Sequence, residues 1–424
     1  MRLSEDKLPA GFEFIENRLF CEGCSVEKLA DKYGTPLYIY SRNHFLERLK
    51  EFKQALAGRD HMICFAVKSN SNLGILNCLA SHGCGFDIVS GGELQRVIKA
   101  GADTDRVVYA GVGKTAAEQK MALQAGIHMF NVESWPEILQ LNQQAGQLDK
   151  IAPIALRVNP DVDAKTHAKI TTGKKENKFG IPATELVKYA EKIHSLANLR
   201  LKGLHFHIGS QITSIDPFVE LGQKVRSSVT GLRKQGFEIG TVNLGGGLGI
   251  DYTDEKTISP ARWADAVFPA IDDLDLKIII EPGRYLVGNS GILVTSVLYL
   301  KEAVTKKFVI VDAGMNTLIR PAMYDAYHEI GNAVKQDRQL IEADIVGPVC
   351  ETGDSFGSER VIERPEAGEY LAIYSSGAYG FPMASHYNSI PRPAELLVDN
   401  DSVCLIRERE TYEDLWRGEK IYSG

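Results

Sequence analysis

Residues 85–110 read GFDIVSGGELQRVIKAGADTDRVVYA, and this stretch indicates the fold. An apolar run at 85–89 is followed by a helix-like stretch at 92–100 and by a second apolar run at 106–110. A strand, a helix and a further strand in this order are typical of a βαβ unit, whose strands run parallel. The stretch therefore predicts one step of a parallel sheet that is covered by helices.

The same alternation continues on both sides of this stretch. Further strands are expected at 62–67, 128–132, 154–158, 201–207, 241–244 and 277–280, and further helices at 116–125, 135–145, 183–195, 217–235 and 261–274. Eight strand–helix units between residues 62 and 284 favour an α/β fold of the (β/α)8 barrel type. A doubly wound sheet is the alternative, but it would need fewer strands, and no GxGxxG phosphate loop fits the sequence.

The pattern changes after Arg284, where strand-like runs follow one another with few helices between them. These runs lie at 292–300, 308–312, 341–346, 370–374 and 396–406, and similar pieces occur at 12–15 and 37–40. We therefore predict an N-terminal segment at 1–40 that joins a mainly β domain at 285–424, and a barrel at 41–284 between them.

Composition and charge exclude several classes of protein. The chain has 424 residues, 44% of them hydrophobic and 24% charged, with a net charge of −7. An acidic chain without a basic stripe is a poor binder of nucleic acid. The longest apolar stretch, 291–300, is interrupted by Thr295 and Ser296 and is too short to span a membrane, and the N-terminus MRLSEDKLPA lacks the apolar region of a signal peptide. We expect a cytoplasmic enzyme with no membrane or nucleic-acid partner.

The seven cysteines do not predict a metal site or a set of disulfides. Cys21 and Cys24 form a lone CxxC, whereas a zinc site needs a second pair at similar spacing. We interpret these two as unrelated thiols. Four others stand in apolar surroundings and are expected in the core: Cys64, Cys78, Cys84 and Cys404.

In a barrel, catalytic side chains lie where the strands end at the C-terminal face. The residues at these positions are Lys68, Asp87, Arg157, Asn159, His205, His207, the NLGGGLG run at 243–249, and Glu281, Gly283 and Arg284 of EPGR. The consecutive glycines allow a ligand to approach the backbone and offer N–H groups to an anion, although an isolated GGG would more often be a sharp turn. The loops after strands seven and eight are where barrels often bind a phosphate, so we predict a phosphate site here.

A phosphate site beside a lysine suggests pyridoxal 5'-phosphate. Lys68 would form a Schiff base with the aldehyde, and the ring would accept electrons. By itself Lys68 would be read as a surface lysine. Glu281 would keep the pyridine nitrogen protonated, although an ion pair with Arg284 is the simpler interpretation of that carboxylate.

His205 and His207 are two residues apart on one strand, so they share a face. An HxH pair can bind a metal, and metal-dependent hydrolase barrels carry it at the end of the first strand. That position is occupied here by Lys68. We therefore predict no metal, and expect one imidazole to stack on the cofactor ring and the other to lie in the core.

Taken together, four motifs resemble the alanine-racemase-fold (fold type III) decarboxylases of basic amino acids: FAVKSN, HFHIGSQ, NLGGGLG and EPGR. Three later motifs, RPAMYDAYH (320–328), GPVCETGD (347–354) and GAYGFPMASHYN (377–388), resemble the diaminopimelate decarboxylase family. The resemblance runs from about Gly11 to Ile406 and keeps the order of the motifs. Thr352 stands where this family usually has serine.

The resemblance implies roles for residues around the cofactor. Lys68 carries it, His207 stacks on its ring, Glu281 holds the pyridine nitrogen and Asp87 lies near by. The phosphate is surrounded by a set of small and polar residues: Ser210, Gly245, Gly246, Gly247, Gly283, Arg284 and Tyr379.

The resemblance also implies how the substrate, meso-2,6-diaminopimelate, is bound and converted to L-lysine and CO2, the last step of lysine biosynthesis. The distal carboxylate is held by Arg284, Arg320 and Tyr324, and the distal ammonium by Glu351. Tyr379 is also expected to bind the substrate. Cys350 reaches in from the partner subunit of a homodimer with shared active sites and returns a proton. The residue chemistry agrees, because arginine presents a planar fork to a carboxylate.

Several alternatives stay open. A related decarboxylase could act on carboxynorspermidine, lysine or ornithine, although lysine and ornithine have no distal carboxylate for Arg320 to bind. A non-catalytic cofactor-binding or regulatory relative could lose Lys68 or Cys350, and this chain keeps both. A metal-dependent hydrolase barrel would be distinguished by a metal assay.

Overall fold

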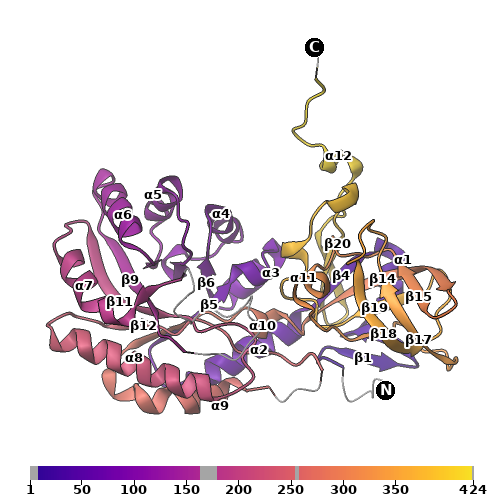
Figure 1. The fold of residues 1–424 in the computed structure, drawn as a ribbon, viewed down its shortest axis with the longest axis horizontal. Helices are drawn as coiled ribbons and strands as arrows, with labels where there is room; N and C mark the ends of the chain where they lie inside the picture. The colour runs from indigo at the N-terminus through magenta and orange to yellow at the C-terminus, as the bar shows by residue number, and fades with distance from the viewer. Residues whose placement is uncertain (1–7, 163–178, 254–256, 423–424) are drawn as a thin grey trace. The chain divides into compact units, whose positions relative to one another are not determined.

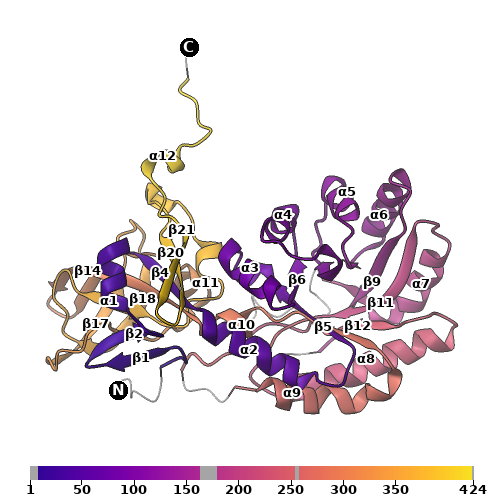
Figure 2. The same ribbon diagram turned by 180° about the vertical axis from the view of Figure 1, so that it is seen from behind.

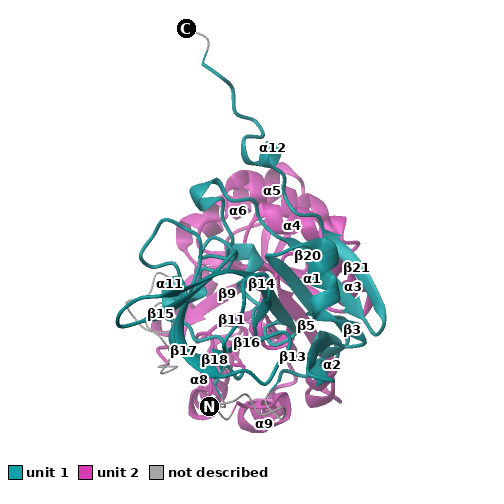
Figure 3. Cartoon of the chain, turned by 90° about the vertical axis from the view of Figure 1, so that its right-hand side faces the viewer, with its two compact units in different colours: residues 1–47, 251–255, 287–424 teal, residues 48–250, 256–286 magenta. Residues whose placement is uncertain are grey.

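The computed structural model describes residues 8–162, 179–253 and 257–422. The chain forms two compact units (Figure 3). Unit 1 consists of residues 1–47, 251–255 and 287–424, and unit 2 consists of residues 48–250 and 256–286. The domain boundaries predicted from the sequence, 1–40, 41–284 and 285–424, stay a prediction.

In the described part of unit 2, eight parallel strands close into a barrel. They are β5 (His61–Ala66), β6 (Gly85–Ile88), β7 (Val107–Tyr109), β8 (Met129–Val132), β9 (Ala152–Asn159), β11 (Leu199–Phe206), β12 (Thr241–Asn243) and β13 (Lys277–Ile280). Each strand pairs in parallel with the next, and β13 pairs with β5, which closes the ring. The short strand β10 (Ile181–Pro182) adds to the end of β9. The predicted (β/α)8 barrel is confirmed.

Helices alternate with these strands and lie outside them (Figures 1 and 2). They are α2 (Arg42–Ala55), which begins in unit 1, and α3 (Leu73–Ser81), α4 (Gly91–Lys99), α5 (Ala116–Ala125), α6 (Trp135–Gln147), α7 (Leu186–His194), α8 (Asp216–Lys234) and α9 (Pro260–Val267). Local sequence sets several helix ends. Thr115 and Glu118 form a capping box at the start of α5, and Gly126 ends that helix in the left-handed conformation. Side chains from β5, β7, β8, β9 and β13 form a buried cluster in the barrel: Met62, Cys64, Val108, Met129, Ala155 and Ile279.

Unit 1 is built on a sheet with strand order β18-β17-β15-β14-β4-β20-β21, to which β19 and β16 are attached through β14. Its strands are β4 (Leu37–Ser41), β14 (Gly291–Glu302), β15 (Lys307–Val311), β16 (Ile330–Asn332), β17 (Leu340–Val346), β18 (Ser355–Glu363), β19 (Tyr370–Ile373), β20 (Ala394–Asp399) and β21 (Ser402–Arg407). Although β4 comes early in the sequence, it lies between β14 and β20, which come much later. Three short helices are α10 (Arg284–Val287), which begins in unit 2, α11 (Arg320–Tyr324) and α12 (Tyr412–Leu415).

The N-terminal residues of unit 1 form a small sheet of their own. It contains β1 (Phe12–Ile15), β2 (Arg18–Cys21) and β3 (Cys24–Ser25), and α1 (Val26–Tyr33) follows. Cys21 and Cys24 face each other across the β2–β3 hairpin and are free thiols. One expectation about the cysteines was wrong: Cys404 is exposed, because it lies on β21, the outermost strand of the sheet.

Candidate active site

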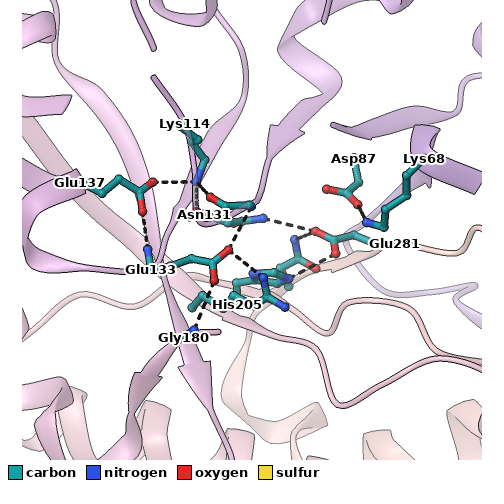
Figure 4. Close-up of polar contacts among 12 residues, drawn as sticks. Lys68, Asp87, Lys114, Asn131, Glu133, Glu137, Gly180, His205 and Glu281 are labelled. Atoms are coloured by element: carbon teal, nitrogen blue, oxygen red, sulfur yellow. Dashed lines mark hydrogen bonds and ion pairs between the residues drawn. The ribbon is translucent and has the colours of Figure 1, made fainter. Parts of the chain in front are cut away.

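A lysine and a buried carboxylate meet at the C-terminal ends of the first two barrel strands. Lys68 lies in the single turn Val67–Ser69 that follows β5, and its Nζ is 2.6 Å from Oδ2 of Asp87 on β6. The Asp87 side chain is fully buried, and burial raises its pKa to about 6, with repulsion from Glu281 adding to the effect and the charge of Lys68 opposing it. The ion pair with Asp87 therefore fixes the position of the Lys68 ammonium at this end of the barrel (Figure 4).

Glu281, directly after β13, accepts hydrogen bonds from three other strands. Its Oε1 is 2.6 Å from Nδ2 of Asn243 and 3.3 Å from Nδ2 of Asn131, and its Oε2 is 3.2 Å from Nε2 of His205 (Figure 4). Burial alone would raise the pKa of Glu281, but the attraction and hydrogen bond of His205, together with the charge of Lys68, outweigh burial and lower the pKa. Glu281 is thus an ionised carboxylate in a buried site.

The two histidines of the HxH pair have different surroundings. His205 is buried against Glu281, whereas His207 accepts a 3.3 Å hydrogen bond on Nδ1 from the backbone N–H of Gly246. Burial lowers the pKa of His207 to about 3, and the positive charges of Arg157 and Lys68 lower it further. The His207 ring is therefore neutral at neutral pH.

The glycine loop after β12 is a tight cradle. Gly245 and Gly247 have φ of +67° and +113°. A Cβ added to Gly245 would lie 2.4 Å from the carbonyl oxygen of Phe206, and one added to Gly246 would lie 2.3 Å from that of Glu281. No side chain fits at these positions, so the loop presents bare backbone.

The second loop expected at the phosphate is also close-packed, though less tightly. A Cβ on Gly283 would lie 3.0 Å from both Cβ of Ala66 and Oγ of Ser69. Next to it, Arg284 donates a 3.3 Å hydrogen bond to Oγ of Ser210, which brings two of the predicted phosphate residues together. Backbone N–H groups, a hydroxyl and a guanidinium are a donor set that fits a phosphate, and the nearby Lys68 fits an aldehyde.

A cluster of buried polar side chains next to this site was not predicted from the sequence (Figure 4). Nζ of Lys114 is 2.7 Å from Oε1 of Glu137, 2.7 Å from the carbonyl oxygen of Asn131 and 2.8 Å from that of Gly111. Glu133 pairs with Arg157 at 2.7 Å. Asn131 lies at the end of a barrel strand, so the rule that identified Lys68 could also have identified it. Nothing in the sequence around Lys114 indicates that this loop lysine is buried.

Arg320 of unit 1 is buried at the start of α11, close to Tyr324 on the same helix. Its Nη1 donates to Nε2 of His328 at 2.7 Å, and Nδ1 of His328 is 2.8 Å from the carbonyl oxygen of Tyr374. Since arginine can only donate and a carbonyl can only accept, His328 carries its proton on Nδ1. The guanidinium carbon also lies 4.8 Å from the ring centre of Tyr252.

The loop that carries Cys350 and Glu351 is held at its backbone. Asp354 accepts from the N–H of Val349 at 2.7 Å, and Asn388 accepts from the N–H of Cys350, also at 2.7 Å. Cys350 and Glu351 are both exposed, so Cys350 is not a buried structural thiol.

The predicted site residues fall into two groups. Unit 2 holds Lys68, Asp87, His207, Ser210, Gly245, Gly246, Gly247, Glu281, Gly283 and Arg284, and unit 1 holds Arg320, Tyr324, Cys350, Glu351 and Tyr379. In the described ranges, no group of three or more His, Cys, Asp or Glu side chains is placed to hold a metal ion. None of the helices in the described part of the chain is long and apolar enough to cross a membrane.

Comparison with known proteins identifies the family. Residues 42–288 match a family model described as the pyridoxal binding domain of pyridoxal-dependent decarboxylases. The chain is 50% identical over 402 residues to diaminopimelate decarboxylase of Aquifex aeolicus, which covers 95% of each chain. It is 46% identical over 411 residues to that of Pseudomonas fluorescens, covering 97% of this chain and 99% of the relative.

Solved structures agree with the sequence relatives. The Helicobacter pylori diaminopimelate decarboxylase complexed with L-lysine matches with a TM-score of 0.89 and 43% identity, over 92% of this chain and 98% of that chain. A lysine/ornithine decarboxylase from Vibrio vulnificus matches with a TM-score of 0.78 and 21% identity, over 88% and 97% of the two chains, which shows the fold alone. The chain belongs to the diaminopimelate decarboxylase family of pyridoxal-dependent decarboxylases.

Proposed function

We propose that this protein uses pyridoxal 5'-phosphate to convert meso-2,6-diaminopimelate to L-lysine and CO2. The observation that carries the proposal is 50% identity to a diaminopimelate decarboxylase over 95% of both chains, in a chain that has Lys68 at the end of the first barrel strand. When bound, the cofactor supplies an aldehyde for the substrate amine and a ring that accepts the electron pair left by CO2.

One set of residues would hold the cofactor. Lys68 binds the aldehyde, and Asp87 keeps the lysine in place. Glu281, as an anion, keeps the ring nitrogen protonated, and the neutral ring of His207 stacks against the cofactor without competing for a proton. The phosphate is bound by Ser210, Gly245, Gly246, Gly247, Gly283, Arg284 and Tyr379.

A second set of residues would select and protonate the substrate. Arg320, with Arg284 and Tyr324, would bind the carboxylate of the end that does not react, Glu351 would bind its ammonium, and Tyr379 would also contact the substrate. Cys350 donates a proton to the carbon that has lost CO2. We propose that Cys350 and Glu351 act in the site of a second subunit, so that a homodimer has two shared sites, and that the enzyme works in the cytoplasm.

Product analysis tests the reaction directly. Purified protein loaded with pyridoxal phosphate is given meso-diaminopimelate, L-lysine, L-ornithine or carboxynorspermidine in turn, and released CO2 and the amine product are measured. We expect L-lysine from diaminopimelate at a kcat/KM at least about a hundredfold above the others, because they lack the distal carboxylate. Equal rates with lysine or ornithine would refute the substrate assignment.

A further inference from the structure

We propose that Asn131 and Asn243 are positioning residues that keep Glu281 ionised and correctly oriented, and that the buried pair of Lys114 and Glu137 fixes Asn131 for this task. The inference rests on the proposed role of Glu281 at the cofactor ring, and it adds residues to which that proposal gives no part.

The hydrogen bonds around Glu281 leave room for one further donor. An ionised carboxylate offers about four acceptor positions. Three of them are used by Asn243, Asn131 and His205, at 2.6, 3.3 and 3.2 Å. These three donors come from β12, β8 and β11, so three separate strands fix the carboxylate. The remaining position suits the N–H of a protonated ring nitrogen.

Burial makes these contacts strong. Asn131 and Asn243 are fully buried, and His205 and Glu281 are 1% and 6% exposed. The charge of Lys68 and the hydrogen bond of His205 favour the Glu281 anion, whereas the nearby Asp87 opposes it. Hydrogen bonds from amide donors favour the charged form of a carboxylate, so their loss should raise the pKa of Glu281 and weaken its hold on a protonated ring.

The Lys114–Glu137 pair supports the strand that carries Asn131. The Lys114 side chain is fully buried, and its ammonium binds Glu137, Gly111 and the carbonyl oxygen of Asn131 itself. The lysine therefore holds the end of β8 against the loop after β7 and the start of α6 (Figure 4). Asn131 is fixed at its backbone by a cation while its side chain contacts Glu281.

The test replaces each amide by an acid of nearly the same shape. Asn131→Asp and Asn243→Asp keep the volume but exchange an N–H donor for an oxygen that repels the Glu281 anion. The matched control is Asn77→Asp, because Asn77 of α3 donates at 3.0 Å to the carbonyl oxygen of Ala100, in the same unit but away from Glu281. Each variant is measured for kcat, KM, the dissociation constant of pyridoxal phosphate, the absorption spectrum of the bound cofactor, and Tm.

We expect Asn243→Asp to lower kcat by about tenfold or more, the effect of losing a hydrogen bond to a charged group. Asn131→Asp should have a smaller effect because its bond is longer. Both should shift the cofactor spectrum and weaken cofactor binding, with little change in the KM for diaminopimelate. Asn77→Asp should change Tm alone. In a Glu281→Gln background, the two aspartate variants should cause no further loss of kcat.

Several outcomes would overturn the inference. If both variants change Tm but keep wild-type kcat and spectrum, the amides have only a structural role. If Glu281→Gln itself keeps wild-type kcat and spectrum, the proposed role of Glu281 fails, and this inference fails with it. If Glu281→Gln is impaired and the asparagine variants are not, this inference fails alone. Should Asn243→Asp not fold, Asn131→Asp and Asn131→Ala provide the same comparison.

The part played by Lys114 has its own variant. Lys114→Met combined with Glu137→Gln removes both buried charges together, so neither is left unpaired. We expect a fall in kcat of about threefold, with the same direction of spectral shift as Asn131→Asp. If this double variant keeps the wild-type kcat and spectrum, Lys114 and Glu137 have no part in positioning Asn131.

Discussion

Replacing Arg320 by alanine should raise the KM for diaminopimelate far more than it lowers kcat. The guanidinium is 6% exposed and is held by His328 at 2.7 Å, so it is already oriented before substrate binds. Losing one partner of a buried charge pair costs about 2 to 4 kcal/mol, or about 30- to 900-fold in KM. The KM of Arg320→Lys should lie between those of the wild type and Arg320→Ala, because an ammonium keeps the charge but cannot present the planar fork of a guanidinium.

The assay is release of CO2 over a range of diaminopimelate concentrations, at a temperature well below Tm. Arg320→Ala also leaves His328 without its donor, which should reduce stability by about 1 to 3 kcal/mol, so Tm is measured in parallel. Arg364→Ala is the control, because Arg364 is half exposed and meets Glu302 at the surface, 3.3 Å away. A folded Arg320→Ala variant with an unchanged KM would refute the reasoning.

Three further predictions concern the cofactor, the assembly and the pH dependence of stability. Lys68→Ala should lose the visible absorption band of the bound cofactor and all activity while keeping its circular dichroism; borohydride treatment that still attached the cofactor to this variant would contradict the assignment. Mixing and re-associating inactive Lys68→Ala and Cys350→Ala subunits should restore activity in about half of the sites of the mixed dimers, and no recovery would mean that Cys350 acts within its own subunit. The pKa of His207 is about 3 against an ordinary 6.5, so the unfolded chain takes up the proton first as pH falls. His207 should therefore remove about 2.5 kcal/mol of unfolding free energy between pH 7 and 4.5. Urea titrations measure this free energy at each pH, and a loss in His207→Gln as steep as that of the wild type would refute the prediction.

The barrel could be predicted because each of its strands is a short apolar run followed by a helical pattern. The same logic identified Lys68, Asp87 and Glu281, since catalytic side chains gather at one end of such strands. Contacts between distant residues could not be predicted in this way. Asn131 and Glu281 are 150 residues apart, and nothing near either residue indicates its partner.

Other differences have local physical reasons. Residues 396–406 were expected as one strand, but Asn400, with φ of +54°, turns the chain and divides the run into β20 and β21. Lys114 was given no role, because a charged side chain in a loop is usually solvated. Its complete burial depends on three acceptors that the fold supplies from separate places in the sequence.

The position of β4 has a consequence for synthesis of the chain. Tyr40 on β4 donates its hydroxyl hydrogen to Glu395 on β20, 355 residues later, and the two strands pair side by side. At about 5 to 20 residues per second, tens of seconds pass at the ribosome between the appearance of β4 and that of β20. The barrel strands emerge within that interval. β4 is therefore among the last strands to complete its pairing although it is made early, and its apolar side chains have to stay out of wrong contacts until then.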